Sequence, residues 1–225
     1  MRRNDSGELL DKNGLTEREF LAAYRADRYP RPSVTADIML LSETPDGVET
    51  LLIRRGGHPY LGCWALPGGF AGPSERVEQA AARELEEETH VADLPLYPLM
   101  LCSAPGRDPR GWTISQAYLA LVRRAELPVQ AGDDAAEARW FSLARTGALP
   151  DVTLSLLNGA GLSLTARLHA AARRTPFGDD WDISVTNPGG IAFDHAAILL
   201  RGLLAYEARM RRLPRRALPG HRTRL

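Results

Sequence analysis

The amino-acid sequence predicts an α+β protein built on a mixed β-sheet with a few helices. Short stretches in which apolar and polar residues alternate, the pattern of a half-buried strand, recur along the chain. Two longer stretches, 73–90 and 193–212, repeat apolar residues at helical spacing instead. The Pro-Gly breaks between them are scattered and none resembles a linker, so we expect one domain over residues 1–225.

The first predicted element is an N-terminal helix in about residues 16–30. Thr16 and Glu19 have the spacing of a capping box, in which each side chain bonds to the backbone N–H of the other residue. Pro30 and Pro32 cannot continue a helix, so we expect it to end before them.

The strands of the predicted sheet follow from alternation with a period of two. Val34, Ala36, Ile38 and Leu40 share one face of the first strand, and a Thr-Pro-Asp-Gly turn at 44–47 leads to its partner. The predicted strands are 33–41, 49–55, 96–104, 113–124, 137–143 and 181–186, together with a hairpin at 152–169.

The last third of the chain contains the least usual segment, an inserted hairpin region at 151–188. Residues alternate on both sides of Asn-Gly-Ala-Gly at 158–161, which is typical of a β-hairpin. We expect this insert to serve packing or a dimer contact. The amphipathic helix 193–212 follows, and we expect the basic tail 213–225 to be solvated.

Composition and charge exclude several classes of protein. The 28 basic and 28 acidic residues give a formal net charge of zero, which argues against nucleic acid as a partner. No apolar stretch approaches the ~20 residues of a membrane span, and the start of the chain lacks the apolar core of a signal peptide, so we expect a cytoplasmic protein. Cys63 and Cys102 are too few for a disulfide framework and belong to no zinc pattern.

The most informative pattern is the acid-rich helix predicted at 73–90, with Ser74 as its N-cap. Glu84, Glu87 and Glu88 fall on one helix face, in line with small apolar residues that should face the protein body. Only Arg83 can reach one of them, while Glu84 and Glu88 repel each other. A charge run is usually a solvated surface, but this placement favours a site for Mg²⁺, which prefers oxygen ligands.

Two glycines precede this helix, in the run Leu-Pro-Gly-Gly-Phe at 66–70. Gly68 and Gly69 are expected where backbone passes close to another group, and a glycine carbonyl can itself be a metal ligand. Free N–H groups at the start of the helix would suit phosphate. A pair of glycines on its own more often marks only a turn.

Together these residues resemble the Nudix box. The resemblance implies the Nudix fold, a mixed sheet sandwiched between helices, and Mg²⁺-dependent (or Mn²⁺-dependent) hydrolysis of a nucleoside diphosphate linked to another moiety. It further implies that Glu84, Glu87 and Glu88 ligate the metals with the Gly68 carbonyl, and that Glu75 holds Arg83. The matching positions are Gly69, Glu75, Arg83, Glu84, Leu85, Glu87, Glu88 and Val91.

His90 stands where the Nudix box has glycine. A glycine there suits the left-handed residue that ends a helix, a conformation that His tolerates at a cost of about 1 kcal/mol. No carboxylate is lost, so we expect activity to survive. A catalytic His90 is the alternative.

The resemblance extends beyond the box to the ADP-ribose pyrophosphatase branch of the family, which includes Nudix-related regulators of NAD metabolism. It implies hydrolysis of ADP-ribose to AMP and ribose 5-phosphate, and a homodimer. The alternatives are a nucleoside-triphosphate pyrophosphatase and an ADP-ribose-sensing regulator without strong turnover; we expect too little chain after 212 for the winged helix of such regulators. The stretches that carry the resemblance are 31–41, 51–70, 106–112, 138–143 and 191–199.

Four arginines are candidate substrate ligands, because the guanidinium fork suits phosphate. Arg107 and Arg110 lie in a loop bracketed by Pro and Gly, where Asp108 could instead pair with one of them. Arg54 and Arg55 end a strand, and we expect one of them to bind the pyrophosphate.

Other candidates are less specific. Trp64, Tyr60 or Phe70 could stack on adenine or be core aromatics, and His195 could line the site or be structural. The candidates for the general base are Glu87, Asp133, Asp134 and Glu137.

Overall fold

The computed structural model describes residues 1–127, 135–176 and 178–212, so the predicted basic tail 213–225 lies outside the described residues. The chain divides into two compact units, of which the first is Met1–Pro32. In this unit the short strands β1 (Arg2–Arg3) and β2 (Leu9–Leu10) pair antiparallel, followed by the helix α1 (Glu17–Ala23) and a 3₁₀ turn, η1 (Ala26–Arg28).

The start of α1 confirms the predicted capping box. Thr16 N–H donates to Glu19 Oε2 at 2.8 Å, and Glu19 N–H donates to Thr16 Oγ1 at 3.3 Å. The helix ends at Ala23, before the prolines.

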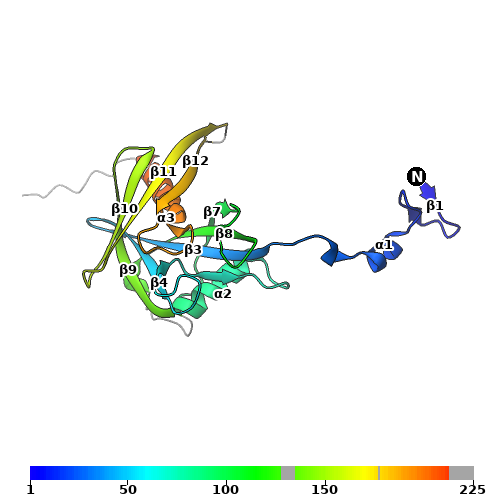
Figure 1. Ribbon diagram of the computed structural model, residues 1–225, viewed down its shortest axis with the longest axis horizontal. Coiled ribbons are helices and arrows are strands. Elements are labelled where there is room, and N and C mark those ends of the chain that lie inside the picture. The colour runs from blue at the N-terminus through cyan, green and yellow to red at the C-terminus, as the bar shows by residue number, and fades with distance from the viewer. Residues whose placement is uncertain (128–134, 177, 213–225) are drawn as a thin grey trace, which may run out of the picture. The chain divides into compact units, whose positions relative to one another are not determined.

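The second unit, from Ser33 on, is built on a sheet of ten described strands (Figure 1). Its order is β12-β11-β10-β9-β4-β3-β8-β7, with β5 added to β4 and β6 added to β3. The pair β3–β8 is parallel and the other pairs are antiparallel, which makes the sheet mixed as predicted. The strands are β3 (Ser33–Thr44), β4 (Gly47–Arg55), β5 (Trp64–Ala65), β6 (Gly68–Phe70), β7 (Tyr97–Cys102), β8 (Thr113–Val122), β9 (Ala135–Thr146), β10 (Asp151–Asn158), β11 (Ser163–Thr175) and β12 (Gly178–Asn187).

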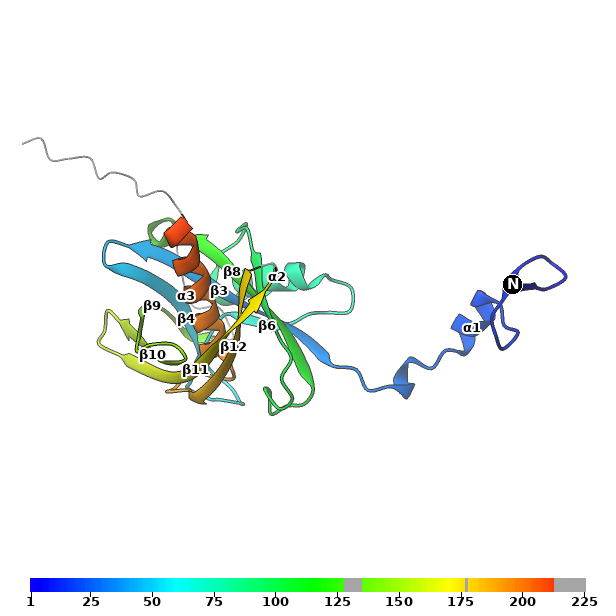
Figure 2. The same cartoon turned by 90° about the horizontal axis from the view of Figure 1, so that it is seen from above.

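Helices α2 (Val77–Thr89) and α3 (His195–Arg212) cover opposite faces of this sheet, which confirms the α+β class (Figures 1 and 2). The alternation of β3 explains how both faces are filled. Ala36, Ile38 and Leu40 pack in a cluster with α2, whereas Met39 and Leu41 pack in the cluster that contains α3. None of the described helices is long and apolar enough to cross a membrane.

The region 151–188 adds three strands to one edge of the sheet. β10 and β11 form the predicted hairpin, in which Leu156 faces Leu164 and the Asn158 side chain accepts the N–H groups of Ala160 and Leu162. β12 is the further strand predicted at 181–186, and it is longer than expected. Alternate residues of β10 and β11 are buried on the face that carries α3.

Helix α2 starts later than the sequence predicts. Its N-cap is Arg76, whose N–H donates to Gln79 Oε1 at 2.9 Å, so the prediction of Ser74 as N-cap is wrong. The C-cap is His90, in the left-handed conformation with φ 58° and ψ 26°, and its N–H donates to the Glu86 carbonyl at 2.8 Å. The His is therefore accommodated at the position where a glycine would be free of strain.

We predict that His90→Gly stabilises the protein. Glycine adopts the left-handed conformation without the steric cost of a Cβ, so the free energy of unfolding should rise by about 1 kcal/mol in urea titrations. Ala82→Gly is the matched control: it adds glycine to an exposed, right-handed position of the same helix and should lower stability by about 1 kcal/mol. A His90→Gly protein less stable than the parent would show that the strain at this cap is unimportant.

Candidate functional site

The three glutamates predicted to share a face of α2 lie along the border of its buried stripe. Ala81 and Leu85 are in the core, and the Glu84 side chain beside them is only 17% exposed. Glu88 is also half-buried, whereas the Glu87 side chain is 57% exposed. The helix therefore holds two carboxylates against the protein body and a third nearer to solvent.

Arg83 connects these carboxylates to the loop before the helix. Its Nη1 donates to Glu84 Oε1 at 2.8 Å and to Glu87 Oε2 at 3.0 Å. Its Nη2 donates to Glu75 Oε1 and to the Phe70 carbonyl, both at 3.0 Å. The pKa of Arg83 is raised by its bonds to Glu75 and Glu84. The structure thus places Glu75 and Arg83 in direct contact, between loop and helix.

Gly68 and Gly69 pass between β3 and the glutamates. The Gly68 N–H donates to Glu88 Oε2 at 2.8 Å. The residue has φ 152°, and a Cβ added to it would collide with the Ala36 carbonyl. A Cβ at Gly69 would collide with the carboxylate of Glu84. Gly68 needs glycine because a side chain would collide with the β3 backbone, whereas a side chain at Gly69 would displace the Glu84 carboxylate from its present position.

Burial makes these carboxylates costly to ionise. It raises the pKa of Glu88 to about 8, with the charge of Glu84 adding to the effect and the Gly68 N–H opposing it. Burial likewise raises the pKa of Glu84. A bound cation would favour the ionised form of both groups, and oxygen donors of this kind suit a hard divalent ion.

No group of three or more acidic, His or Cys side chains is gathered to hold a metal among the residues that the structure describes. Arg83 accounts for this in part, because it occupies oxygens of Glu84 and Glu87. Mg²⁺ needs only one or two carboxylates, since water and substrate phosphate complete its shell. The donor set therefore fits such an ion.

A small pocket of about 80 Å³ opens beside Gly68 and Gly69. Its walls come from the first half of β3, the end of β4, the loop 105–112 and the start of α3, and Arg55, Arg107 and Arg110 all line it. Small-molecule sites usually enclose several hundred Å³, so this pocket has room for a charged group rather than for a whole nucleotide.

Phe193 and His195, at the start of α3 and just before it, line this pocket, and Asp194 between them contacts Arg107. Phe193 packs on Tyr60 with ring centroids 4.7 Å apart. Asp194 accepts two hydrogen bonds from Arg107, at 2.8 Å from Nε and 2.6 Å from Nη2. His195 reaches back to the glycine loop, where its Nδ1 accepts the Leu66 N–H at 2.9 Å.

His195 also approaches a buried acid that the sequence analysis did not single out. Because Nδ1 is an acceptor, the neutral ring carries its proton on Nε2, 3.4 Å from Asp37 Oδ1. Asp37 also accepts the Ser115 hydroxyl at 2.5 Å and lies 3.6 Å from Arg107 Nη2. Burial alone would raise the pKa of Asp37, but His195, Ser115 and Arg107 outweigh it and lower the pKa.

Asp108 pairs with Arg110, which confirms the predicted alternative that Asp108 binds one of the two arginines of this loop. Arg110 Nη2 donates to Asp108 Oδ2 at 2.7 Å, yet its guanidinium still lines the pocket and lies 4.7 Å from the centroid of the Phe70 ring. Trp64 is buried against Phe141 and belongs to the core.

Other predicted residues lie away from this pocket. Arg54 lines a separate hollow that also contains Glu137, and its Nη1 is 3.9 Å from Glu137 Oε2. Glu137 also pairs with Arg139. Asp133 and Asp134 lie outside the described residues.

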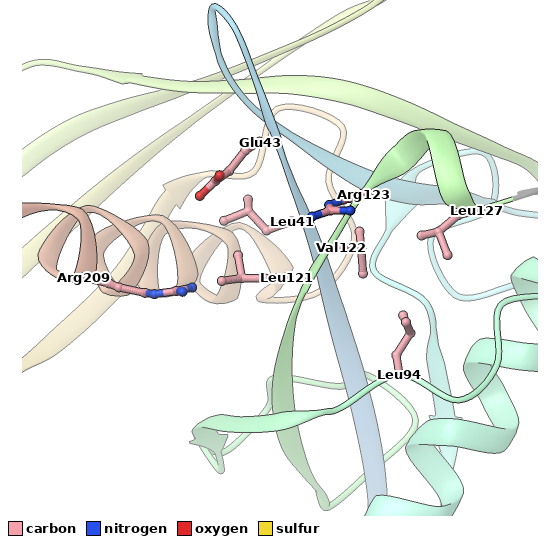
Figure 3. Close-up of a pocket in the computed structure, with 8 residues that line it drawn as sticks. All are labelled: Leu41, Glu43, Leu94, Leu121, Val122, Arg123, Leu127 and Arg209. Atoms are coloured by element: carbon pink, nitrogen blue, oxygen red, sulfur yellow. The ribbon is translucent and has the colours of Figure 1, made fainter. Parts of the chain in front are cut away.

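A larger cavity of about 650 Å³ lies near the carboxyl ends of β3 and β8 (Figure 3). Figure 3 shows Leu41 and Leu121 on one side of β3 and Leu94 on the other, so the cavity wraps around the strand ends. Half of its lining residues are leucine, and the lining includes neither the glutamates of α2 nor the glycine pair. Size alone therefore does not identify the site; the carboxylates and arginines lie around the smaller pocket.

Known proteins are similar to the part of the chain that contains the glycine pair and α2. Residues 31–157 match the family model of the NUDIX domain. An ADP-ribose pyrophosphatase of Methanocaldococcus jannaschii is 39% identical over 137 residues, which cover 61% of this chain and 76% of the relative. An ADPR responsive transcriptional repressor of Acinetobacter baylyi is 35% identical over 50% of this chain and 46% of its own length.

A solved structure extends the similarity to most of the chain. The crystal structure of a MutT/nudix family protein from Enterococcus faecalis has a TM-score of 0.69 and 32% sequence identity, and the match covers 89% of this chain and 73% of that one.

We predict that Asp194→Ala destabilises the protein by about 3 kcal/mol, because it leaves the Arg107 side chain, 4% exposed, without its bidentate partner. Chemical unfolding followed by circular dichroism measures the change. Asp180→Ala is the matched control, since its pair with Arg173 is exposed and should contribute less than about 1 kcal/mol. Equal effects of the two substitutions would contradict a structural role for the buried pair.

Proposed function

Because the chain belongs to the NUDIX domain family, we propose that it hydrolyses the pyrophosphate bond of a nucleoside diphosphate derivative, with ADP-ribose as the substrate and AMP and ribose 5-phosphate as the products. One observation carries the proposal: Glu84 and Glu88, half-buried on α2, face the glycine pair at the edge of an arginine-lined pocket. The 39% identity to an ADP-ribose pyrophosphatase supports this choice of substrate.

The carboxylates of Glu84, Glu87 and Glu88, with the Gly68 carbonyl, would hold divalent cations, magnesium first and manganese as the alternative. When bound, such a cation neutralises the pyrophosphate and activates a water for in-line attack. Glu75 and Arg83 fix the loop before α2 to the helix, so that Gly68 and Gly69 stay in place against Glu84 and Glu88.

The pocket arginines would bind the diphosphate. Arg55 and Arg110 are the best placed, because each lines the pocket beside the glycine pair. Arg107 lines it as well, but its side chain is only 4% exposed, against 40% for Arg110, and its Nε–Nη2 edge bonds to Asp194. We therefore assign Arg107 to holding the loop 105–112 and the Asp37 carboxylate. Gly69 provides backbone for close approach of substrate, and Arg54 stays a predicted contact that lies beside Glu137.

The general base is proposed to be Glu87, since its carboxylate is the most exposed of the three on α2. Glu137 pairs with Arg54 and Arg139 and lies in the separate hollow, away from the glycine pair. Asp133 and Asp134 remain predictions. The homodimer remains an expectation from the family resemblance, and the cytoplasmic location remains a prediction from the sequence.

The substrate is tested by a Mg²⁺ assay over ADP-ribose, NADH, diadenosine polyphosphates, sugar nucleotides and dNTPs, with release of the corresponding nucleoside monophosphate (AMP from ADP-ribose) as the measurement. We expect the highest kcat/KM with ADP-ribose, and chelation of the cation should abolish turnover. Turnover of dNTPs alone would instead establish a nucleoside-triphosphate pyrophosphatase.

A sensor without strong turnover is the second candidate, and the similarity to an ADPR responsive repressor over half of this chain favours it. Tight ADP-ribose binding by calorimetry, with no hydrolysis of any compound in the panel, would establish this function and overturn the enzymatic one.

The role of the glutamates is tested by Glu84→Gln and Glu87→Gln. Each removes a charge while keeping the shape, so kcat/KM should fall by at least about a hundredfold with the fold intact. Glu86→Gln is the matched control, because Glu86 is exposed on the same helix and should leave activity unchanged. A fully active Glu87→Gln variant would exclude both the metal role and the base role of that residue.

A further inference from the structure

We propose that Phe193 is a positioning residue: its ring holds the guanidinium groups of Arg55 and Arg110 together as one diphosphate-binding clamp. The proposal rests on the proposed function and specifies how the pocket would recognise the two phosphates. No local sequence pattern marks this residue or this role.

The central observation is that two cations lie on one aromatic ring. Arg55 Cζ is 5.0 Å from the centroid of the Phe193 ring, and Arg110 Cζ is 5.5 Å from it. Both distances are within the ~6 Å over which a guanidinium is attracted to the negative face of a ring. All three residues line the pocket beside Gly68 and Gly69.

The guanidinium groups of Arg55 and Arg110 repel each other, and attraction to the shared ring opposes this repulsion. The pKa of Arg55 is lowered, first by burial and then by the charge of Arg110. Each arginine is also fixed at its other side: Arg55 Nε donates to the Pro59 carbonyl at 2.7 Å, and Arg110 is held by Asp108. The Phe193 ring therefore adds one contact that is shared by two side chains anchored elsewhere, and Arg110 also lies 4.7 Å from the centroid of the Phe70 ring. Both guanidinium groups line one pocket. A diphosphate, with adjacent negative groups, is the ligand that such a pair fits best.

The backbone at Phe193 supports the same conclusion. Its φ is 51°, in the left-handed region that bulky side chains rarely adopt. Tyr60, which packs on it, has φ 62°. Glycine would occupy either position without strain, so the strained conformation needs a compensating contact. Strain of this kind in bulky residues is concentrated at ligand-binding sites.

The ring is tested by comparing Phe193→Leu with Phe193→Tyr. Leucine keeps an apolar side chain on the same left-handed backbone and removes only the aromatic face, whereas tyrosine keeps that face. For Phe193→Leu we expect KM for ADP-ribose to rise about tenfold with kcat within about twofold of the parent. For Phe193→Tyr we expect both constants to stay near those of the parent. Tyr97→Leu, at an exposed aromatic on β7, is the control for aromatic loss outside the pocket.

A double-mutant cycle separates action through the arginines from direct contact with substrate. Phe193→Leu is combined with Arg55→Ala and Arg110→Ala together. If the ring works through the two guanidinium groups, it should add almost no further rise in KM once both are gone. An equal rise in the presence and absence of the arginines would overturn the proposal, as would a fall in kcat at unchanged KM.

Binding of inorganic pyrophosphate, measured by calorimetry, tests the clamp without turnover. Phe193→Leu should weaken this binding about tenfold, while Phe193→Tyr and Tyr97→Leu should not. Pyrophosphate binding that is unaffected by Phe193→Leu in a folded protein would overturn the clamp. Because this measurement needs no catalysis, a protein that hydrolyses no substrate would refute the proposed function while the clamp is still judged on its own.

Discussion

The arrangement of the site depends on one close approach, the passage of Gly68 and Gly69 between β3 and the carboxylates of α2. A side chain at Gly68 would collide with the β3 backbone, and one at Gly69 would collide with Glu84. The hydrogen bond from Gly68 N–H to Glu88 fixes the depth of this passage. It also lowers the cost of burying Glu88, although burial still raises the pKa of that carboxyl to about 8. Carboxyl groups with such a perturbed pKa are concentrated at sites where a bound ligand or ion can stabilise the charged form.

Arg83 keeps this acidic face stable without neutralising it. Glu75, Glu84 and Glu87 surround its guanidinium, so three carboxylates face one positive charge and two negative charges are left over when all are ionised. A divalent cation matches that excess. The same arginine bonds to the Phe70 carbonyl and so ties β6 to α2. The charge balance and the geometry of the glycine loop therefore depend on the same side chain.

Sequence reasoning succeeded wherever the determining interaction is local. Alternation placed Ala36, Ile38 and Leu40 on one face of β3, and the capping box placed the start of α1. Helical spacing put Glu84 and Glu88 beside the buried face of α2. Alternation also implies that Arg54 and Arg55 point to opposite sides of β4, but not which side carries the pocket.

Long-range contacts were beyond such reasoning. The bond between His195 and Leu66 joins residues 129 positions apart, and no local pattern encodes it. Asp37 did give a local signal, an acid within an apolar strand, but its partners Ser115 and Arg107 are distant in sequence. Ser74 is not the N-cap, although its local pattern suits one: the N-cap is Arg76, and Glu75 just before it bonds to Arg83 and to the Gly72 N–H.

The inserted region 151–188 packs against α3 and so helps to hold that helix in position. The first residue of this helix and the two residues before it contact Leu66, Arg107 and Tyr60, which lie in three separate loops around the pocket. The geometry of those contacts therefore depends on how α3 is packed against the sheet. Figure 2 shows α3 lying along β11 and β12, and the buried leucines of β10 and β11 share one cluster with those of α3. The strands added at 151–187 thus cover the helix on its apolar side, and a change in their packing would reach the pocket through α3 rather than by direct contact.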